Sequence, residues 1–248
     1  MLGNFDSWLY ANESIYTREE KSKNFWKVNG KTGNNWLFMM RVLAILIWIS
    51  IEWPLILNKE GYVETFLKFY TNWTFYTWSV WLVCIIYSQI IYEQIRLEPA
   101  TPSDSLLQLW KVCSSLFCVS FLHSIMVSLL WFLLIYPTLN PSSINMTDYL
   151  KHSLPSGTLL LEFFFNSIVI EARYIIPVLV YGTFYLLWLI YYTTTGDRWI
   201  YSVLKLDKRA DWGLLFLIIL SYLMVFSVLS AMNELKFTLI YRTKACPA

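Results

Sequence analysis

Apolar residues dominate six stretches of the chain, each long enough to cross a lipid bilayer as a helix. The hydrocarbon core of a bilayer is about 30 Å thick, which corresponds to roughly 20 helical residues. Polar and proline-containing segments separate the stretches, and the sequence shows neither an internal repeat nor a second domain. The pattern predicts an all-α integral membrane bundle of six transmembrane helices, at about residues 36–57, 66–92, 106–136, 152–170, 175–192 and 213–235.

The predicted membrane domain covers residues 36–235. Before it, residues 1–35 form a polar and aromatic segment without an apolar run of signal-peptide type, so we expect targeting through the first transmembrane helix. After it, residues 236–248 form a short polar tail. Lysine and arginine are concentrated before the first helix and after the last, which predicts both termini on the cytosolic or matrix side. The sequon at residues 145–147 lies on the predicted opposite side, where it could be glycosylated if that side is a lumen.

Composition supports a membrane protein and excludes other classes. The chain is 57% hydrophobic and 15% charged, whereas soluble domains have about 25% charged residues. Aromatic residues make up 19% of the chain, which suits the two membrane interfaces. A net charge of +2 provides no nucleic-acid surface. Four scattered cysteines and two histidines predict no metal site, and no motif indicates a cofactor.

Thr71 and His152 are the first candidates for chemistry. The second and fourth helices both begin on the outer side; Thr71 lies about six residues into the second, and His152 opens the fourth. At 1.5 Å per residue, both lie within roughly 10 Å of the same membrane face. A hydroxyl and an imidazole at matching depth can form an activated nucleophile and its base. The helix macrodipole would keep His152 neutral, and Asp148 is expected to cap this helix.

Both residues also have a purely structural interpretation. A transmembrane threonine such as Thr71 commonly bonds back to its own helix. An interfacial histidine such as His152 can bond a lipid headgroup or a backbone carbonyl. The hydroxyls of Thr74, Thr77 and Ser79 are as available in the sequence as that of Thr71.

Glu162 is the most unusual residue of the predicted spans, because a carboxylate near the bilayer midplane is unfavourable and marks a functional candidate. It lies about 15 Å deeper than His152 and about 80° around the helix, so we do not expect it to orient that ring. The alternative is a protonated or paired carboxyl that fixes helix packing, with His123 as a possible partner. Glu52 and Glu171 lie closer to helix ends and are expected at the interface.

Several of these residues fall in runs that resemble a known family. The run at residues 69–75, Phe-Tyr-Thr-Asn-Trp-Thr-Phe, resembles the Phe-Leu-Thr-Asn-Trp run of rolling-stone-like membrane proteins. His152 followed ten residues later by Glu162 resembles the histidine and acidic residue of that group and of the related androgen-induced-gene family. Further similar positions follow in the fifth helix and the loop after it: residues 181–185, Trp188, Tyr191, Tyr192, Trp199 and Tyr201. The resemblance covers about residues 36–235.

The resemblance implies a function as well as a fold. Mammalian androgen-induced-gene proteins are six-helix membrane hydrolases of fatty acid esters of hydroxy fatty acids. They use an intramembrane threonine and histidine, which match Thr71 and His152. We expect Asn72 to donate a hydrogen bond to the oxyanion, and the loop at residues 196–211 to act as a lid. The pocket is expected to include Glu162, Tyr185, Trp188, Trp199 and Tyr201.

The alternative function is that of a non-catalytic accessory subunit in a larger membrane complex. In that case the segment at residues 1–35, which lies outside the resemblance, would dock against partner subunits. A transporter or channel is disfavoured, because the chain lacks inverted-repeat symmetry and a row of intramembrane charges.

Overall fold

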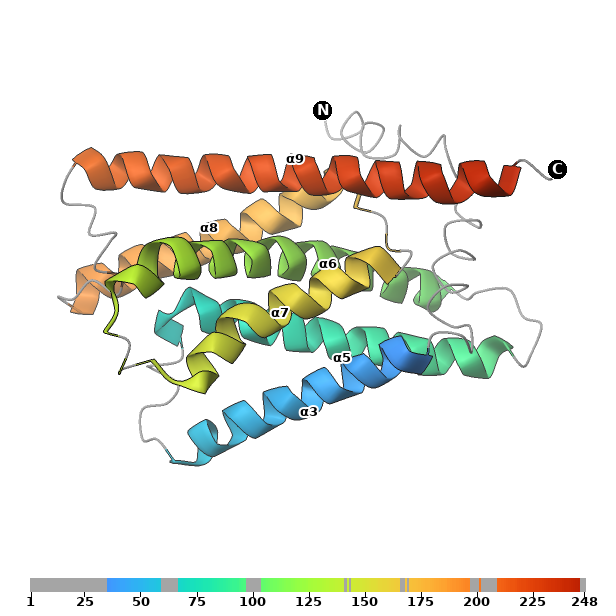
Figure 1. Ribbon diagram of the computed structural model, residues 1–248, viewed down its shortest axis with the longest axis horizontal. Helices are drawn as coiled ribbons and strands as arrows, with labels where there is room; N and C mark the ends of the chain where they lie inside the picture. The colour runs from blue at the N-terminus through green and yellow to red at the C-terminus, as the bar shows by residue number, and fades with distance from the viewer. Residues whose placement is uncertain are drawn as a thin grey trace.

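The part of the chain that the structure describes folds into six long helices, and consecutive helices run in opposite directions (Figure 1). The structure is a computed structural model that describes residues 35–58, 67–96, 104–140, 142, 144–165, 168, 170–196, 201 and 209–245. The long helices are α3 (Asn35–Asn58), α5 (Tyr70–Arg96), α6 (Asp104–Leu130), α7 (Met146–Phe165), α8 (Ile175–Gly196) and α9 (Arg209–Ala245). Within these described ranges the chain forms no strand.

Irregular helical turns extend α6 and precede α8. After Leu130, α6 continues as one π-helical turn, Trp131–Ile135, and then as a 3-10 turn, Tyr136–Thr138. Pro137 has no N–H group and cannot make the helical hydrogen bond to the carbonyl four residues earlier, which favours the end of a regular helix here. A second 3-10 turn, Ala172–Tyr174, leads into α8.

Five of the helices contain a stretch that is long and apolar enough to cross a membrane. These stretches are Trp36–Pro54, Tyr70–Ile91, Lys111–Thr138, Ala172–Thr195 and Trp212–Lys236. The sixth helix, α7, has 20 residues and therefore a length of about 30 Å, but it is less apolar than the others. Its polar residues Thr158 and Glu162 are buried inside the bundle. The predicted six-helix bundle is confirmed, and the protein is a multi-pass membrane protein.

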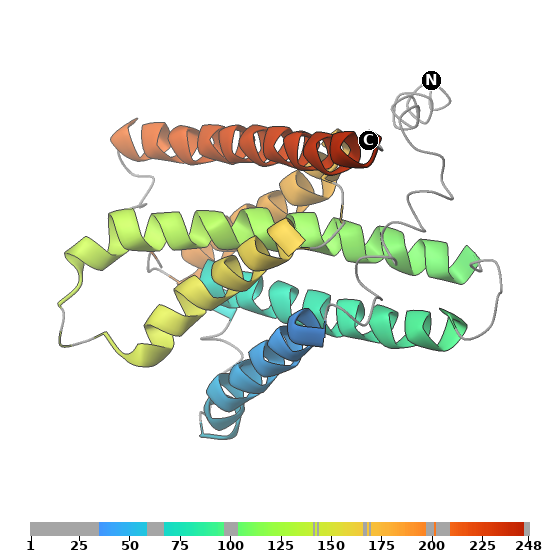
Figure 2. The same ribbon diagram turned by 45° about the vertical axis from the view of Figure 1, so that its right-hand side comes forward.

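The antiparallel helices α5 and α6 form the centre of the bundle, with α3 and α9 on opposite sides of them (Figures 1 and 2). The core between α5, α6 and α7 is aromatic; its largest fully buried side chains include Trp78, Trp81, Phe117, Phe121 and Phe163. By contrast, only 6% of the residues in the span of α9 are buried. The exposed large apolar side chains of the outer helices form the surface that faces lipid.

A buried ion pair joins α3 to α7. Nε and Nη2 of Arg41 donate to the two carboxylate oxygens of Glu162 at 2.6 and 2.8 Å. The remaining Nη1 donates to Oε1 of Gln89 on α5 at 2.7 Å. Both charged side chains are 0% exposed. Glu162 is thus paired with Arg41, and the suggested partnership with His123 is wrong.

A second ion pair joins the same two helices. Nζ of Lys151 lies 2.5 Å from Oε1 of Glu52, whose side chain is 1% exposed. On each helix the two charged positions are eleven residues apart, which is about three turns and returns to the same face. We call Arg41–Glu162 and Glu52–Lys151 the α3–α7 ion pairs. The basic residue is on α3 in one pair and on α7 in the other.

The helix starts differ from those predicted. Helix α5 begins at Tyr70, so Thr71 is its second residue rather than about the sixth. Helix α7 begins at Met146, which places His152 in the second turn rather than at the first residue. Asn145 caps α7 instead of Asp148: its side chain accepts the Asp148 N–H at 2.9 Å, and the Asp148 carboxylate accepts the Asn145 N–H at 3.0 Å. This reciprocal arrangement is a capping box, so the helix starts six residues before His152.

Replacing either Arg41 or Glu162 alone with leucine is expected to lower the free energy of unfolding by about 3–5 kcal/mol, because an uncompensated buried charge remains. In the double variant Arg41→Leu/Glu162→Leu neither charge remains, so we expect much of that loss to be recovered. Denaturant unfolding of the purified protein in detergent micelles measures all three values.

The half-buried pair formed by Arg173 and Glu171, 2.8 Å apart, provides the control. Arg173→Leu is expected to lower the free energy of unfolding by about 1 kcal/mol or less. Additive losses in the Arg41/Glu162 double variant would contradict a coupled buried pair.

Candidate functional site

Thr71 and His152 meet at the wall of a cavity in the bundle. Oγ1 of Thr71 lies 3.0 Å from Nε2 of His152, although 81 residues separate them in the chain. Both side chains are half-buried, and both line a cavity of about 260 Å³. The first turn of α5 and the second turn of α7 are therefore neighbours at the same end of the bundle.

The hydrogen bonds of His152 define which ring nitrogen carries the proton. Nδ1 lies 2.7 Å from the carbonyl oxygen of Asp148, which can only accept. Nδ1 therefore carries the hydrogen in the neutral ring, and Nε2 is free to accept one from the Thr71 hydroxyl. The carbonyl one helical turn earlier orients the imidazole, as a carboxylate does in a serine-hydrolase triad. The macrodipole acts mainly within the first turn of a helix, and His152 lies in the second turn. The neutral tautomer therefore depends on the Asp148 carbonyl.

Trp131 covers the face of the His152 ring. The two rings are stacked, with centroids 4.4 Å apart and an interplanar angle of 17°. Trp131 is buried and opens the π-helical turn at the end of α6. Such π-helical turns are rare and often occur at functional sites. Trp131 could not be predicted from the sequence, because nothing in an apolar aromatic run marks one ring as lying over a histidine.

Lys151 fixes the depth of His152 relative to Thr71. Besides its ion pair with Glu52 on α3, Nζ of Lys151 lies 3.5 Å from Oδ1 of Asn72 on α5. Lys151 directly precedes His152, and Asn72 directly follows Thr71. The three helices α3, α5 and α7 are therefore joined by polar contacts at the level of the candidate site.

Polar contacts between α6 and α7 hold the backbone of α7 at His152. The hydroxyl of Ser128 on α6 is hydrogen-bonded to the carbonyl oxygen of His152. Its oxygen also lies 2.8 Å from the hydroxyl oxygen of Ser156. Pro155 lies inside α7 and lacks an N–H group, so the helical hydrogen bond to the Lys151 carbonyl is missing in this part of the helix.

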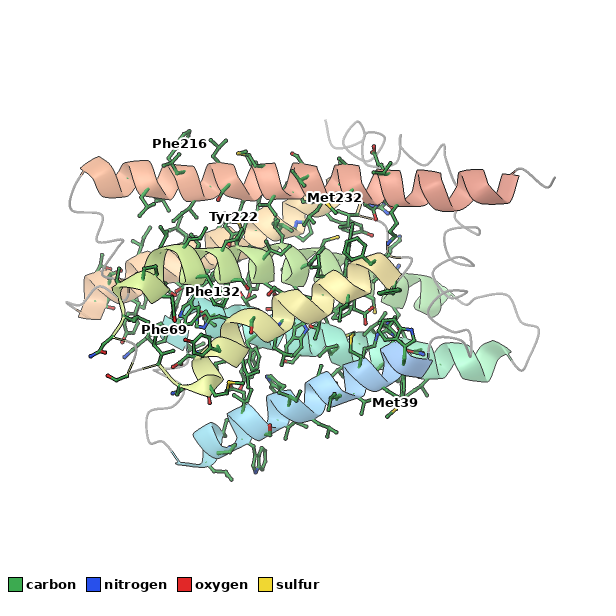
Figure 3. The ribbon with its side chains drawn as sticks, viewed as in Figure 1. Met39, Phe69, Phe132, Phe216, Tyr222 and Met232 are labelled. Atoms are coloured by element: carbon green, nitrogen blue, oxygen red, sulfur yellow. The ribbon has the colours of Figure 1, made fainter. Side chains whose placement is uncertain are left out.

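The cavity is lined mainly by leucine, isoleucine and valine side chains from α6, α8 and α9. In Figure 3, Tyr222 lies on the inner side of α9, whereas Phe216 points away from the bundle. Only 6% of the α9 span is buried, the lowest share of the five spans. The part of the cavity wall that α9 forms therefore belongs to the helix that is least covered by others. An apolar lining with a few polar groups at one end is typical of a binding site for an apolar ligand.

A second polar group, built around His123, lies on the cavity wall. Nε2 of His123 lies 3.1 Å from the carbonyl oxygen of Val178, so it carries the hydrogen and Nδ1 is the acceptor. Nδ1 is hydrogen-bonded to the Tyr70 hydroxyl, and Tyr222 donates to the Tyr70 oxygen at 3.1 Å. These side chains link α5, α6, α8 and α9, and their polar atoms are satisfied by one another in the apolar interior.

The structure brings only part of the expected pocket to the cavity. Tyr185 and Tyr201 line it, and their hydroxyl oxygens are 3.3 Å apart. Trp188 does not; it donates to the carbonyl oxygen of Leu67 at 2.9 Å and packs beside Tyr185. Trp199, like most of the expected lid at residues 196–211, lies outside the described residues.

Two further expected pocket residues point elsewhere. Glu162 is held in the ion pair with Arg41, three helical turns away from His152. Asn72 is absent from the cavity lining, and its amide oxygen faces Lys151. In an α-helix, successive residues project about 100° apart, which explains why Thr71 reaches the cavity and its neighbour does not.

Among the described residues, no three His, Cys, Asp or Glu side chains are grouped so that they could hold a metal ion. Comparison of the chain with protein-family models, with curated proteins and with solved structures found no match.

The chain has only two histidines, and their hydrogen bonds predict opposite neutral tautomers. Nitrogen NMR of the protein labelled with ¹⁵N-histidine should show one ring protonated at Nδ1, which is His152, and one at Nε2, which is His123. Thr71→Val should shift the Nε2 resonance of the first ring alone, and Tyr70→Phe the Nδ1 resonance of the second. Two rings of the same tautomer would contradict the geometry.

Proposed function

We propose that the protein is an intramembrane hydrolase of lipid esters, with Thr71 as nucleophile and His152 as general base. The observation that supports this function is the 3.0 Å hydrogen bond between Thr71 Oγ1 and the free Nε2 of His152, at the wall of an apolar cavity. A hydroxyl alone is a weak nucleophile, and a positioned, neutral imidazole activates it.

The reaction follows from the hydrogen bonds at the site. Thr71 Oγ1 attacks the ester carbonyl carbon while its proton passes to Nε2 of His152. The imidazolium then donates this proton to the leaving alcohol, and an acyl-threonine remains. A water molecule, deprotonated by His152, releases the fatty acid and restores Thr71. The Asp148 carbonyl holds the ring in place during both proton transfers.

The lining of the cavity favours a substrate with an acyl chain. Its leucine and isoleucine side chains bury methylene groups, each of which contributes about 0.8 kcal/mol when removed from water. The helix α9, of whose span only 6% is buried, is the least covered wall of the cavity, and we propose that an acyl chain enters beside it. Fatty acid esters of hydroxy fatty acids, the substrates that the resemblance to the androgen-induced-gene family implies, have this character.

Labelling with a fluorophosphonate probe tests the site. We expect the wild-type protein to be labelled at Thr71 and the Thr71→Ala variant not to react. The His152→Ala variant should react at least about 10²-fold more slowly than the wild type, because a positioned base contributes at least this factor. Mass spectrometry of the labelled peptide identifies the residue that carries the phosphonate.

Thr77→Ala is the matched control. Thr77 is a hydroxyl on the same helix, bonded to the Trp73 carbonyl at 2.9 Å and to Tyr181 at 2.8 Å, and it does not line the cavity. It should be labelled as the wild type is. Equal labelling of all four proteins would reject the proposed function and favour the accessory-subunit alternative. In that case the detergent-extracted protein should migrate with a large complex on native gels.

Trp131 is expected to stabilise the imidazolium that forms on His152, because an aromatic face attracts a cation by about 0.5–2 kcal/mol. Trp131→Leu should lower kcat for ester hydrolysis about 2- to 30-fold. Trp131→Phe, which retains an aromatic face, should retain more of the activity. Equal effects of both substitutions on kcat would argue against the ring as the cause.

A further inference from the structure

The proposed reaction needs a hydrogen-bond donor for the oxyanion that forms on the substrate. When Thr71 attacks the ester, the electron pair of the carbonyl bond moves to the carbonyl oxygen, which then requires a donor in the cavity. Asn72, the expected donor, does not line the cavity and faces Lys151. The phenol groups that line the cavity belong to Tyr70, Tyr185, Tyr201 and Tyr222.

Three of these four phenols already donate to acceptors within the protein. Tyr185 donates to the Lys68 carbonyl at 2.8 Å. Tyr222 donates to the oxygen of Tyr70 at 3.1 Å. Tyr70 donates to Nδ1 of His123, which can only accept because Nε2–H is bound to a backbone carbonyl. Each phenol has one hydrogen, so none of the three has a hydrogen left for a substrate.

Tyr201 differs from the other three. Its oxygen accepts the N–H of Tyr70 at 2.9 Å, a bond that does not use the phenol hydrogen. Because Tyr185 donates elsewhere, the 3.3 Å contact between the two phenols is made by the hydrogen of Tyr201. This distance is long for an O–H···O bond, which is usually about 2.7–2.8 Å. The hydrogen of Tyr201 is therefore the most weakly held of the four and can turn to a ligand.

We infer that Tyr201 is the oxyanion donor of the Thr71 site; this role depends on the proposed hydrolase function. Tyr201 is bonded to the N–H of Tyr70, the residue before the nucleophile, so donor and nucleophile are both fixed to the first turn of α5. The bond from Tyr70 also polarises the phenol and strengthens it as a donor. Tyr201 donates a hydrogen bond and transfers no proton; the proton of Thr71 passes to His152 and then to the leaving alcohol.

Steady-state hydrolysis of p-nitrophenyl octanoate in detergent micelles tests this role. Tyr201→Phe should lower kcat about 10²- to 10³-fold and leave KM within about twofold, because the donor acts on charge that exists only in the transition state. The matched control is Tyr181→Phe, which removes a phenol that is bonded to Thr77 outside the cavity lining. It should leave kcat within about twofold.

A second variant separates donation from support of the Tyr70 backbone, because phenylalanine also removes the acceptor of that N–H. Tyr201→3-fluorotyrosine retains the oxygen and makes the phenol more acidic, so a donor role predicts kcat above the wild-type value, whereas a phenol that only accepts the Tyr70 N–H would give a wild-type or lower value. A kcat at or below wild type in this variant, or wild-type kcat in Tyr201→Phe, would overturn the role of Tyr201. If Thr71→Ala then remains inactive, the hydrolase function survives without it. If the wild-type protein hydrolyses no ester, both proposals are overturned.

Discussion

The buried ion pair between Arg41 and Glu162 is the interaction on which the arrangement of the helices depends. Neither charge reaches solvent; each is paired with the other, and Arg41 also donates to Gln89. In a bilayer, an unpaired charge at this depth is strongly unfavourable, and α3 and α7 therefore have one preferred register. The second pair, Glu52 with Lys151, lies three turns away on the same faces and has the opposite polarity. A shift of one helix along the other would break both pairs at once.

This register determines the candidate site. Lys151, which completes the second ion pair, lies beside His152 and also reaches Asn72 beside Thr71. The imidazole therefore meets the threonine hydroxyl because α7 is held at a fixed depth against α3 and α5. The orientation of the ring is set separately, by the Asp148 carbonyl and by the stacked indole of Trp131. The ion pairs fix the position of the His152 ring, whereas the Asp148 carbonyl determines which ring nitrogen is protonated and the Trp131 indole stabilises the charged ring.

The polar groups around the cavity follow one physical rule: without water, each must find its partner inside the protein. His123, Tyr70 and Tyr222 satisfy one another, and Tyr185 is bonded to a backbone carbonyl. Two groups on the cavity wall carry the proposed chemistry: Nε2 of His152, which is bonded to the Thr71 hydroxyl, and the hydroxyl of Tyr201. They accept and donate, respectively, which is what attack on an ester carbonyl requires.

The sequence by itself determined the helices, because hydropathy adds up locally along a span and needs no knowledge of neighbours. It also placed Thr71 and His152 at similar depth on one side of the membrane, from helix direction and rise per residue alone. The predicted starts of α5 and α7 differ from those in the structure. For α7 the reason is the capping box at Asn145, which extends the helix through polar residues that hydropathy excludes. Only the tertiary structure decided which side chains meet. Arg41 finds Glu162 across 121 residues, and Trp131 covers His152, through the rotation and register of whole helices, which no local pattern encodes.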